Sequence, residues 1–221
     1  MKAKISEIFK SIHGEGIYQG KEQVFVRFYG CGLNCSFCDT KLEFYQEKTV
    51  EEVLESISKY NNYHSISLTG GEPLLQIDFL IDLCHELKIR HETIYLETNG
   101  ILHNNLRKII DYIDIVAMDF KLPSSTRQAE YWSEHKEFLK TAIKKDVFIK
   151  AVIGEDTTTE DVTKAIKLIK EVRHDLCLVL QPQNPLEDLL EEKLQLLHKL
   201  CINEHINAQV FPQMHKKLCI P

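Results

Sequence analysis

Three cysteines lie close together near the start of the chain, at Cys31, Cys35 and Cys38. They have C-x-x-x-C-x-x-C spacing in a glycine-bearing loop that follows the strand-like run 24–29. No fourth cysteine is close enough in sequence to join them locally. A closed structural metal site uses four protein ligands, whereas three thiolates leave one metal position open for a small molecule. The spacing therefore predicts a metal centre that does chemistry.

Two kinds of metal centre fit these thiolates. Zinc ribbons and fingers usually add a second C-x-x-C pair or histidines at set spacing, and His13 is one histidine that could complete such a site. The residue chemistry favours an iron–sulfur cluster over zinc, and either centre over a chance grouping. Phe37, between the last two cysteines, would then flank the cluster and stack on a planar ligand.

The composition limits the function classes that need to be considered. The chain has 221 residues, a length consistent with one α/β domain over residues 1–221. Its formal net charge of −6 argues against a nucleic-acid or membrane-surface binder, which would need a basic face. No apolar run is long enough to span a bilayer, and residues 1–9 lack the apolar core of a signal peptide. Seven cysteines without an export signal indicate the cytoplasm, where thiolates favour metal binding or catalysis over disulfides.

Hydrophobic periodicity predicts strands that alternate with helices along most of the chain. Thr49 and Glu52 form a capping-box pattern at the start of one of these helices. We expect strands at 2–9, 23–29, 65–68, 93–97, 115–119, 147–153, 176–180 and 208–211, and helices at 49–60, 75–87, 103–110, 128–142, 159–172 and 187–201. Alternation of this kind predicts parallel β-α units, with about six of them, fewer than the eight of a complete barrel. The expected fold is α/β, a partial, open parallel β/α barrel.

The residues that could do chemistry come directly after predicted strands. The cysteines follow one strand, and Thr69-Gly70-Gly71-Glu72-Pro73 follows the next. Glu97-Thr98-Asn99-Gly100 and the stretch 121–125 follow two more. Because ligands collect at the carboxyl ends of parallel strands, we expect these groups to meet around one site. Two adjacent glycines would let backbone amides approach a charged ligand, and the Glu72 carboxylate could accept from an ammonium group.

The cysteine motif with an aromatic residue at Phe37, followed by Gly70-Gly71-Glu72-Pro73 after the next strand, resembles the radical S-adenosylmethionine (SAM) superfamily. The resemblance spans the whole series of β-α units. It implies a [4Fe-4S] cluster held by Cys31, Cys35 and Cys38, with SAM chelating the fourth iron. Reductive cleavage of SAM would then give a 5′-deoxyadenosyl radical that abstracts a hydrogen atom from the substrate.

A second resemblance concerns the substrate. The segment Ser11-Ile12-His13-Gly14-Glu15-Gly16, Arg27 on the following strand and Cys38-Asp39-Thr40 are similar to the 7-carboxy-7-deazaguanine synthase family, which usually has Gln where this chain has His13. The resemblance implies a lyase that contracts the ring of 6-carboxy-5,6,7,8-tetrahydropterin to 7-carboxy-7-deazaguanine with loss of ammonia. This reaction lies on the path to queuosine and related 7-deazapurines.

The family resemblance also implies roles for individual residues. Glu15 would accept hydrogen bonds from the guanidine-like edge of the pterin, and Arg27 would grip the substrate carboxylate in a bidentate pair. Thr40 would coordinate Mg²⁺ through its hydroxyl. The implied substrate contacts are Ile12, His13, Gly14, Glu15, Arg27, Thr69 and Pro221, and the implied SAM contacts are Phe37, Cys38, Asp39, Gly71, Lys121 and Ser124.

Further expectations follow from the family. Backbone groups of residues 12–14 would line the pterin, and the carboxyl-terminal tail would fold onto the active site so that the Pro221 carboxylate meets the substrate. A flavodoxin- or ferredoxin-type protein would donate the electron, and the protein would be a homodimer. Two other readings stay open. One is an activase of glycyl-radical enzymes, which carries the same two motifs, and the other is a non-enzymatic ferredoxin-like carrier or zinc-binding interaction domain.

Overall fold

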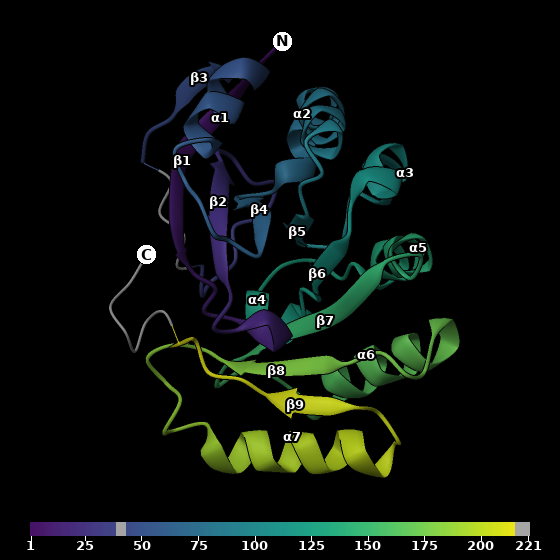
Figure 1. Cartoon of the computed structure of the whole chain (residues 1–221). Helices are drawn as coiled ribbons and strands as arrows, with labels where there is room; N and C mark the ends of the chain where they lie inside the picture. Colours follow the sequence, from purple (N-terminus) through teal and green to yellow (C-terminus); the bar gives the residue numbers. More distant parts are fainter. Residues whose placement is uncertain (39–42, 215–221) are drawn as a thin grey trace.

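The computed structural model describes residues 1–38 and 43–214. Within them, nine strands form one sheet in the order β3-β1-β2-β4-β5-β6-β7-β8-β9 (Figure 1). The strands are β1 (Lys2–Ile12), β2 (Glu22–Phe28), β3 (Gln46–Thr49), β4 (Ser65–Gly70), β5 (Ile94–Thr98), β6 (Ile115–Asp119), β7 (Asp146–Ile153), β8 (Leu178–Pro182) and β9 (Ala208–Val210). The α-helices are α1 (Val50–Ile57), α2 (Ile77–Ile89), α3 (His103–Ile109), α4 (Pro123–Thr126), α5 (Trp132–Ala142), α6 (Thr159–Val172) and α7 (Glu191–Asn203), and the short 3₁₀ helices are η1 (Gly16–Tyr18), η2 (Pro73–Gln76) and η3 (Ile110–Tyr112).

The sheet is mostly parallel and open, as predicted. From β2 to β9, neighbouring strands pair in parallel. At one edge β1 pairs antiparallel with both β2 and β3, and β3 was not predicted. The sheet curves, and the longer helices lie along its outer side (Figure 1). No helix among residues 1–38 and 43–214 is long and apolar enough to cross a membrane.

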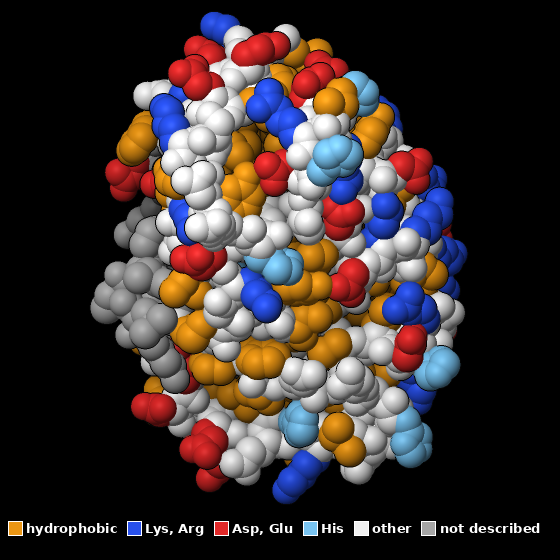
Figure 2. Space-filling model, viewed as in Figure 1, with side chains coloured by type: hydrophobic (Ala, Val, Ile, Leu, Met, Phe, Trp, Pro, Cys, Tyr) orange, Lys and Arg blue, Asp and Glu red, His pale blue; other side chains and the backbone are white. Residues whose placement is uncertain are grey.

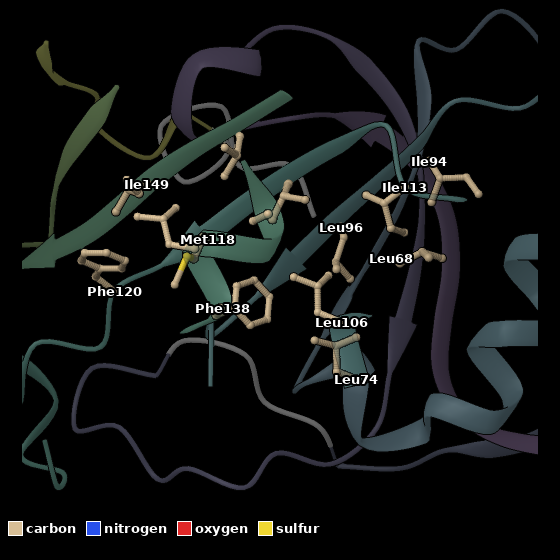
Figure 3. Close-up of a cluster of buried hydrophobic side chains, with 14 of the residues drawn as sticks. Leu68, Leu74, Ile94, Leu96, Leu106, Ile113, Met118, Phe120, Phe138 and Ile149 are labelled. Atoms are coloured by element: carbon tan, nitrogen blue, oxygen red, sulfur yellow. The ribbon is translucent and has the colours of Figure 1, made fainter. Parts of the chain in front are cut away.

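Side-chain alternation along the strands separates the core from the site. On β2, Val24, Val26 and Phe28 are fully buried in the core cluster under the helices, whereas Phe25 and Arg27 on the opposite face line a cavity. The helix-facing core continues from strand to strand, where Leu68, Leu96, Met118 and Ile149 meet Leu106 and Phe138 from α3 and α5 (Figure 3). Burying this apolar face is the main favourable contribution to folding. It leaves the inner face of the sheet for polar groups.

Local signals set several of the element boundaries. The predicted capping box forms: Glu52 N–H donates to Thr49 Oγ1 (3.3 Å), and Thr49 N–H donates to Glu52 Oε2 (2.7 Å). Helix α5 begins four residues later than predicted, at Trp132. The preceding helix α4 ends at Thr126, where Arg127 adopts a left-handed conformation (φ 56°). On the face of the molecule in Figure 2, acidic and basic side chains are interspersed.

Candidate active site

A cavity of about 350 Å³ lies at the carboxyl ends of the parallel strands. Its walls come from β2 and from β4 to β8, together with the cysteine loop and the end of β1. The lining residues are Ile12, His13, Gly14, Glu15, Phe25, Arg27, Cys31, Leu33, Cys35, Phe37, Cys38, Thr69, Gly70, Gly71, Glu97, Thr98, Asn99, Ala117, Asp119, Lys121, Lys150, Val152, Gln181, Gln183, Asn184 and Gln213. The polar residues after the predicted strands therefore do meet around one site.

The cysteine loop is packed directly against the glycine pair. Gly71 N–H donates to Phe28 O (3.0 Å) and Glu72 N–H donates to Gly30 O (2.9 Å), so the turn after β4 is bonded to the residue before Cys31. A Cβ atom on Gly71 would lie 2.0 Å from Gly30 O, a separation that Cβ atoms in folded proteins essentially never show. Glycine is required here because two backbones approach each other.

The far side of the cysteine loop is tied to α4. Ser36 N–H donates to Thr126 O (3.2 Å), and Ser36 Oγ donates to Ser125 O (2.9 Å). Gln128 Nε2 donates to Asn34 O (2.9 Å). Backbone and side-chain hydrogen bonds thus hold the loop from two directions, and the three cysteines line the cavity.

The three thiols fit a cluster better than a single ion. All three cysteines line the cavity, and burial raises the pKa of the Cys31 and Cys35 thiols, while Lys121 opposes that shift. No three histidine, cysteine or carboxylate side chains of the described residues converge to hold one metal ion. Thiolates that bind different irons of a cluster need not converge, so the donor set suits an iron–sulfur cluster with an open iron.

Glu72 is buried beneath the turn after β5 and is hydrogen-bonded within the chain. Its side chain is buried (1% exposed), does not line the cavity, and accepts hydrogen bonds from Leu74 N (3.1 Å), Asn99 N (2.8 Å) and Thr98 Oγ1 (2.9 Å). Burial raises its pKa to about 7, although these hydrogen bonds act in the opposite direction. The carboxylate therefore holds the turn after β5 in place. The expectation that it accepts from an ammonium group of a ligand stays a prediction.

His13 lines the cavity beside Tyr95 and Glu97. Its Nε2 is 3.0 Å from Tyr95 Oη, and its Nδ1 is 3.6 Å from Glu97 Oε1. Its backbone is hydrogen-bonded within the chain: His13 N–H donates to Lys21 O (2.7 Å), and His13 O accepts from Gly20 N–H (2.8 Å). His13 is buried and lines the cavity, and the expectation that its backbone lines the pterin stays a prediction.

A chain of charged groups crosses the floor of the cavity. Glu15 forms an ion pair with Lys150 through Oε2, and its Oε1 accepts from Gln213 Nε2 (2.6 Å). Lys150 Nζ is 3.6 Å from Asp119 Oδ2, which also accepts from Lys121 Nζ (2.9 Å). Lys121 Nζ lies 5.7 Å from the centre of the Phe37 ring. Charged side chains therefore link the Glu15 region to the cysteine loop.

Arg27 and Thr69 lie beside each other on paired strands. Arg27 donates to Glu7 Oε2 (3.0 Å), and its guanidinium lies 5.0 Å from the centre of the Phe9 ring. Thr69 Oγ1 donates to Glu97 Oε2 (2.8 Å). Both residues line the cavity, so a ligand could reach each of them from the same side.

Two acceptors in the cavity are suited to a ligand. Asp119 Oδ1 and Gln181 Oε1 are buried, and neither has a hydrogen-bond partner among the described residues. Buried acceptors are normally satisfied, so these atoms fit hydroxyl or N–H donors of a bound molecule. Together with the three thiols they make the cavity chemically suitable for a cluster and an organic cofactor.

Most of the predicted site residues meet in this cavity. They are Ile12, His13, Gly14, Glu15, Arg27, Thr69, Cys31, Cys35, Cys38, Phe37, Gly71 and Lys121. Ser124 does not line it: its N–H donates to Asp161 Oδ2 (2.8 Å) and its Oγ accepts from Thr158 N–H (3.1 Å), which ties α4 to α6. Asp39, Thr40 and Pro221 lie outside the described residues. The described part of the tail reaches the site through Gln213, and Met214 N–H donates to Gly14 O (2.9 Å).

Sequence reasoning missed Lys150. It lies on β7, where apolar residues surround it in sequence, and this lone charge on one face of a buried strand was the available signal. The residues around the cis Asn184–Pro185 bond, Gln183 and Asn184, were also missed. They lie on an irregular connection with no motif that distinguishes them from ordinary loop residues.

The chain is similar to known proteins in both sequence and fold. A family model described as the radical SAM superfamily matches residues 25–192. The 7-carboxy-7-deazaguanine synthase of Geobacter sulfurreducens is 34% identical over 97% of this chain and 96% of its own length, and that of Methanothermobacter thermautotrophicus is 33% identical over 99% and 98%. The crystal structure of QueE from Escherichia coli has the same fold, with a TM-score of 0.67 at 22% identity over 95% of this chain and 94% of that one. The chain therefore belongs to the radical SAM superfamily and, within it, to the family of 7-carboxy-7-deazaguanine synthases.

Proposed function

We propose that this protein is the carbon–nitrogen lyase that converts 6-carboxy-5,6,7,8-tetrahydropterin to 7-carboxy-7-deazaguanine with loss of ammonia. One observation carries the proposal: a single cavity joins the cysteine triad to Arg27 and Glu15. A guanidinium suits the substrate carboxylate, and a carboxylate suits the donor edge of a pterin. The curated relatives carry the name of the synthase, which favours it over the glycyl-radical activase.

The cofactor side of the cavity would hold the cluster through Cys31, Cys35 and Cys38. When bound, the cluster and SAM supply a 5′-deoxyadenosyl radical that removes a hydrogen atom from the substrate. Gly71 offers backbone close to the cysteine loop, and Lys121 places a positive charge near the Phe37 ring. Asp119 Oδ1 is an acceptor for a hydroxyl or amino group of SAM.

The substrate side would orient the pterin. Arg27 donates to Glu7 and has five N–H donors, enough for a bidentate pair with the substrate carboxylate. Glu15 would accept two hydrogen bonds from the guanidine-like edge. Held at both ends, the ring would present one carbon to the cofactor side, and this positioning is what a radical reaction needs from the protein.

Other parts of the proposal rest on the family resemblance alone. Thr40 would bind Mg²⁺ through its hydroxyl, beside Asp39 at the SAM pocket, and the Pro221 carboxylate would meet the pterin. A hydroxyl ligand suits a hard cation that keeps several waters. We also propose a homodimer in the cytoplasm that takes its electron from a flavodoxin- or ferredoxin-type protein. Ser124 would then support the SAM pocket through the α4–α6 contact.

The test is an anaerobic assay with reconstituted cluster, reductant, SAM, Mg²⁺ and the carboxytetrahydropterin. We expect 7-carboxy-7-deazaguanine and ammonia in equal amounts, detected by mass spectrometry and an ammonia assay. Cys35→Ala is the control, because it removes a cluster ligand and should give no product. An intact cluster in the wild-type protein without deazaguanine product would overturn the proposal.

A further inference from the structure

Lys150 is an unusual residue for the strand on which it lies. On β7, Val147, Ile149 and Ala151 pack into the core under the helices, whereas Lys150 and Val152 on the other face line the cavity. The Lys150 side chain is 15% exposed. A lysine at such a position needs anionic partners, because an unpaired buried charge is strongly unfavourable.

Those partners are carboxylates from three other elements. Glu15, between β1 and η1, forms an ion pair with Lys150, and Asp119 at the end of β6 lies 3.6 Å from its Nζ. Glu97 on β5 adds a further negative charge nearby. Burial alone would lower the pKa of Lys150, but these three carboxylates raise it above its ordinary value. Lys150 is therefore a fixed positive charge at the floor of the site.

Glu15 is correspondingly held as an acceptor. Lys150 binds one of its oxygens and Gln213 Nε2 donates to the other at 2.6 Å. Lys150 and Gln213 are both donors, so the Glu15 carboxylate acts as an acceptor at each of these two contacts. An ionised carboxylate can only accept hydrogen bonds, whereas a protonated one also donates. The state of Glu15 thus decides which ligand edge it can bind.

We propose that Lys150 is a positioning residue that determines specificity: it holds the Glu15 carboxylate in place as an acceptor in the cavity, so that the site selects a ligand edge with two adjacent N–H donors. The inference rests on the proposed function, in which that edge belongs to the pterin. It assigns to Lys150 a role beyond stability, since a buried ion pair is commonly no more stabilising than well-packed apolar residues.

The experiment measures ligand binding rather than turnover. Isothermal titration of the anaerobic holoenzyme uses two oxidised ligands, 6-carboxypterin and 6-carboxylumazine, whose 2-oxo group replaces one N–H donor by an acceptor. The wild-type protein should prefer 6-carboxypterin. Lys150→Met should weaken 6-carboxypterin binding by about 10- to 100-fold, the range expected for a charge-assisted hydrogen bond, and should abolish most of the preference. Iron content should stay unchanged.

Three further variants separate charge from packing. Lys150→Arg keeps the positive charge and should restore the preference for 6-carboxypterin. Lys150→Gln keeps a donor without the charge and should behave like Lys150→Met, and it carries the test if the methionine variant does not retain its cluster. Lys88→Met is the matched control, because Lys88 forms a partly buried ion pair with Asp114, away from the cavity. Its preference should equal that of the wild type.

The outcomes distinguish this inference from the proposed function. If the wild-type protein binds 6-carboxypterin and Lys150→Gln and Lys150→Met keep its preference, the role of Lys150 is overturned. Equal weakening of both ligands, matched by Lys88→Met, would reduce Lys150 to a structural residue and would overturn it as well. If the wild-type holoenzyme neither binds 6-carboxypterin nor forms the deazaguanine, the proposed function itself fails.

Discussion

The two halves of the cavity are built by different means. The half around the cysteines is held by backbone groups and short side chains, such as the Gly71 contact with Phe28 and the Ser36 contact with α4. The half around Glu15 is held by ion pairs between long side chains, of which Lys150 is the centre. Backbone contacts hold a loop in one position, whereas charged side chains give a site its preference among ligands. We call the half around the cysteines and Gly71 the frame, and the half around Glu15 and Lys150 the substrate half.

The two motif glutamates show this difference in one residue type. Glu72 is buried, and its carboxylate binds the N–H groups of Leu74 and Asn99 inside the chain. Glu15 lines the cavity and binds Lys150 and Gln213, both of which are far away in sequence. A carboxylate in a motif therefore need not touch a ligand. Its burial and the source of its hydrogen-bond donors decide which role it has.

The largest expected effect concerns the frame. In Gly71→Ala the new Cβ would lie 2.0 Å from Gly30 O, so the turn and the cysteine loop must move apart. Moving reacting groups out of place by about 1 Å lowers the rate of a reaction by about a hundredfold. We expect Gly71→Ala to lose most of its iron and its product formation, measured by iron analysis and the anaerobic assay.

A second glycine in the same loop supplies the control. Apart from its own chain neighbours, no atom of the described residues lies within 4 Å of the position that a Cβ on Gly32 would occupy. Gly32→Ala should therefore retain its iron and most of its activity. If Gly32→Ala lost iron to the same extent as Gly71→Ala, the loss would come from loop composition and not from the Gly30 contact.

The substrate half should respond in the opposite way. Glu15→Gln removes the charged acceptor and places an amide beside Lys150. The loss of a charge-assisted hydrogen bond predicts a rise in the KM for the carboxypterin of about 10- to 100-fold. Iron content and SAM affinity should stay at the wild-type level. A loss of iron in Glu15→Gln would contradict the separation of the two halves.

Glu72→Gln tests the frame with a milder change. One oxygen that accepts from the backbone becomes an NH₂ group, so a buried backbone N–H of Leu74 or Asn99 loses its partner. An unsatisfied buried donor lowers the free energy of unfolding by about 1–3 kcal/mol. Urea denaturation should show this loss, while the affinity for 6-carboxypterin should not change. The reverse pattern would place Glu72 against the ligand.

The frame was largely predictable from the sequence, and the reason is local. Cysteine spacing and a glycine pair report steric and ligand requirements within a few residues, so Cys31, Cys35, Cys38 and Gly71 were placed correctly at one site. The charged half depends on contacts between distant residues: Glu15 and Lys150 are 135 positions apart. Only the family resemblance pointed to Glu15, and the lone charge on β7 did not identify Lys150 as its partner.

The fold shows the same contrast. Alternation of apolar runs predicted every parallel strand, because each buries an apolar face under helices. Strand β3, Gln46–Thr49, was missed because it has no apolar side chain and forms through backbone pairing with β1. The direction of β1, antiparallel to β2, also carries no mark in its side chains. Pairing at a sheet edge depends on tertiary contacts that a local pattern does not contain.

The smallest expected effect concerns how the free energy of unfolding depends on pH, through a buried histidine beside Asn99. His135 on α5 is fully buried, stacks on Phe120 with ring centres 4.9 Å apart, and has Nε2 3.1 Å from Asn99 O. Burial lowers its pKa from 6.5 to about 4, so the folded protein keeps the ring neutral where the unfolded chain binds a proton. Because only the unfolded chain binds this proton, the free energy of unfolding is unaffected above pH 6.5 and decreases as the pH falls toward 4, by roughly 2 kcal/mol at pH 5. In His135→Gln, the loss of unfolding free energy between pH 7 and pH 5 should therefore be smaller by about that amount, measured by urea denaturation at both pH values.

The exposed His85 provides the control. An equal change in His85→Gln, or an unchanged pH dependence in His135→Gln, would show that other groups cause the acid sensitivity. The neutral His135 ring would then not be needed to hold Asn99, which also binds Glu72.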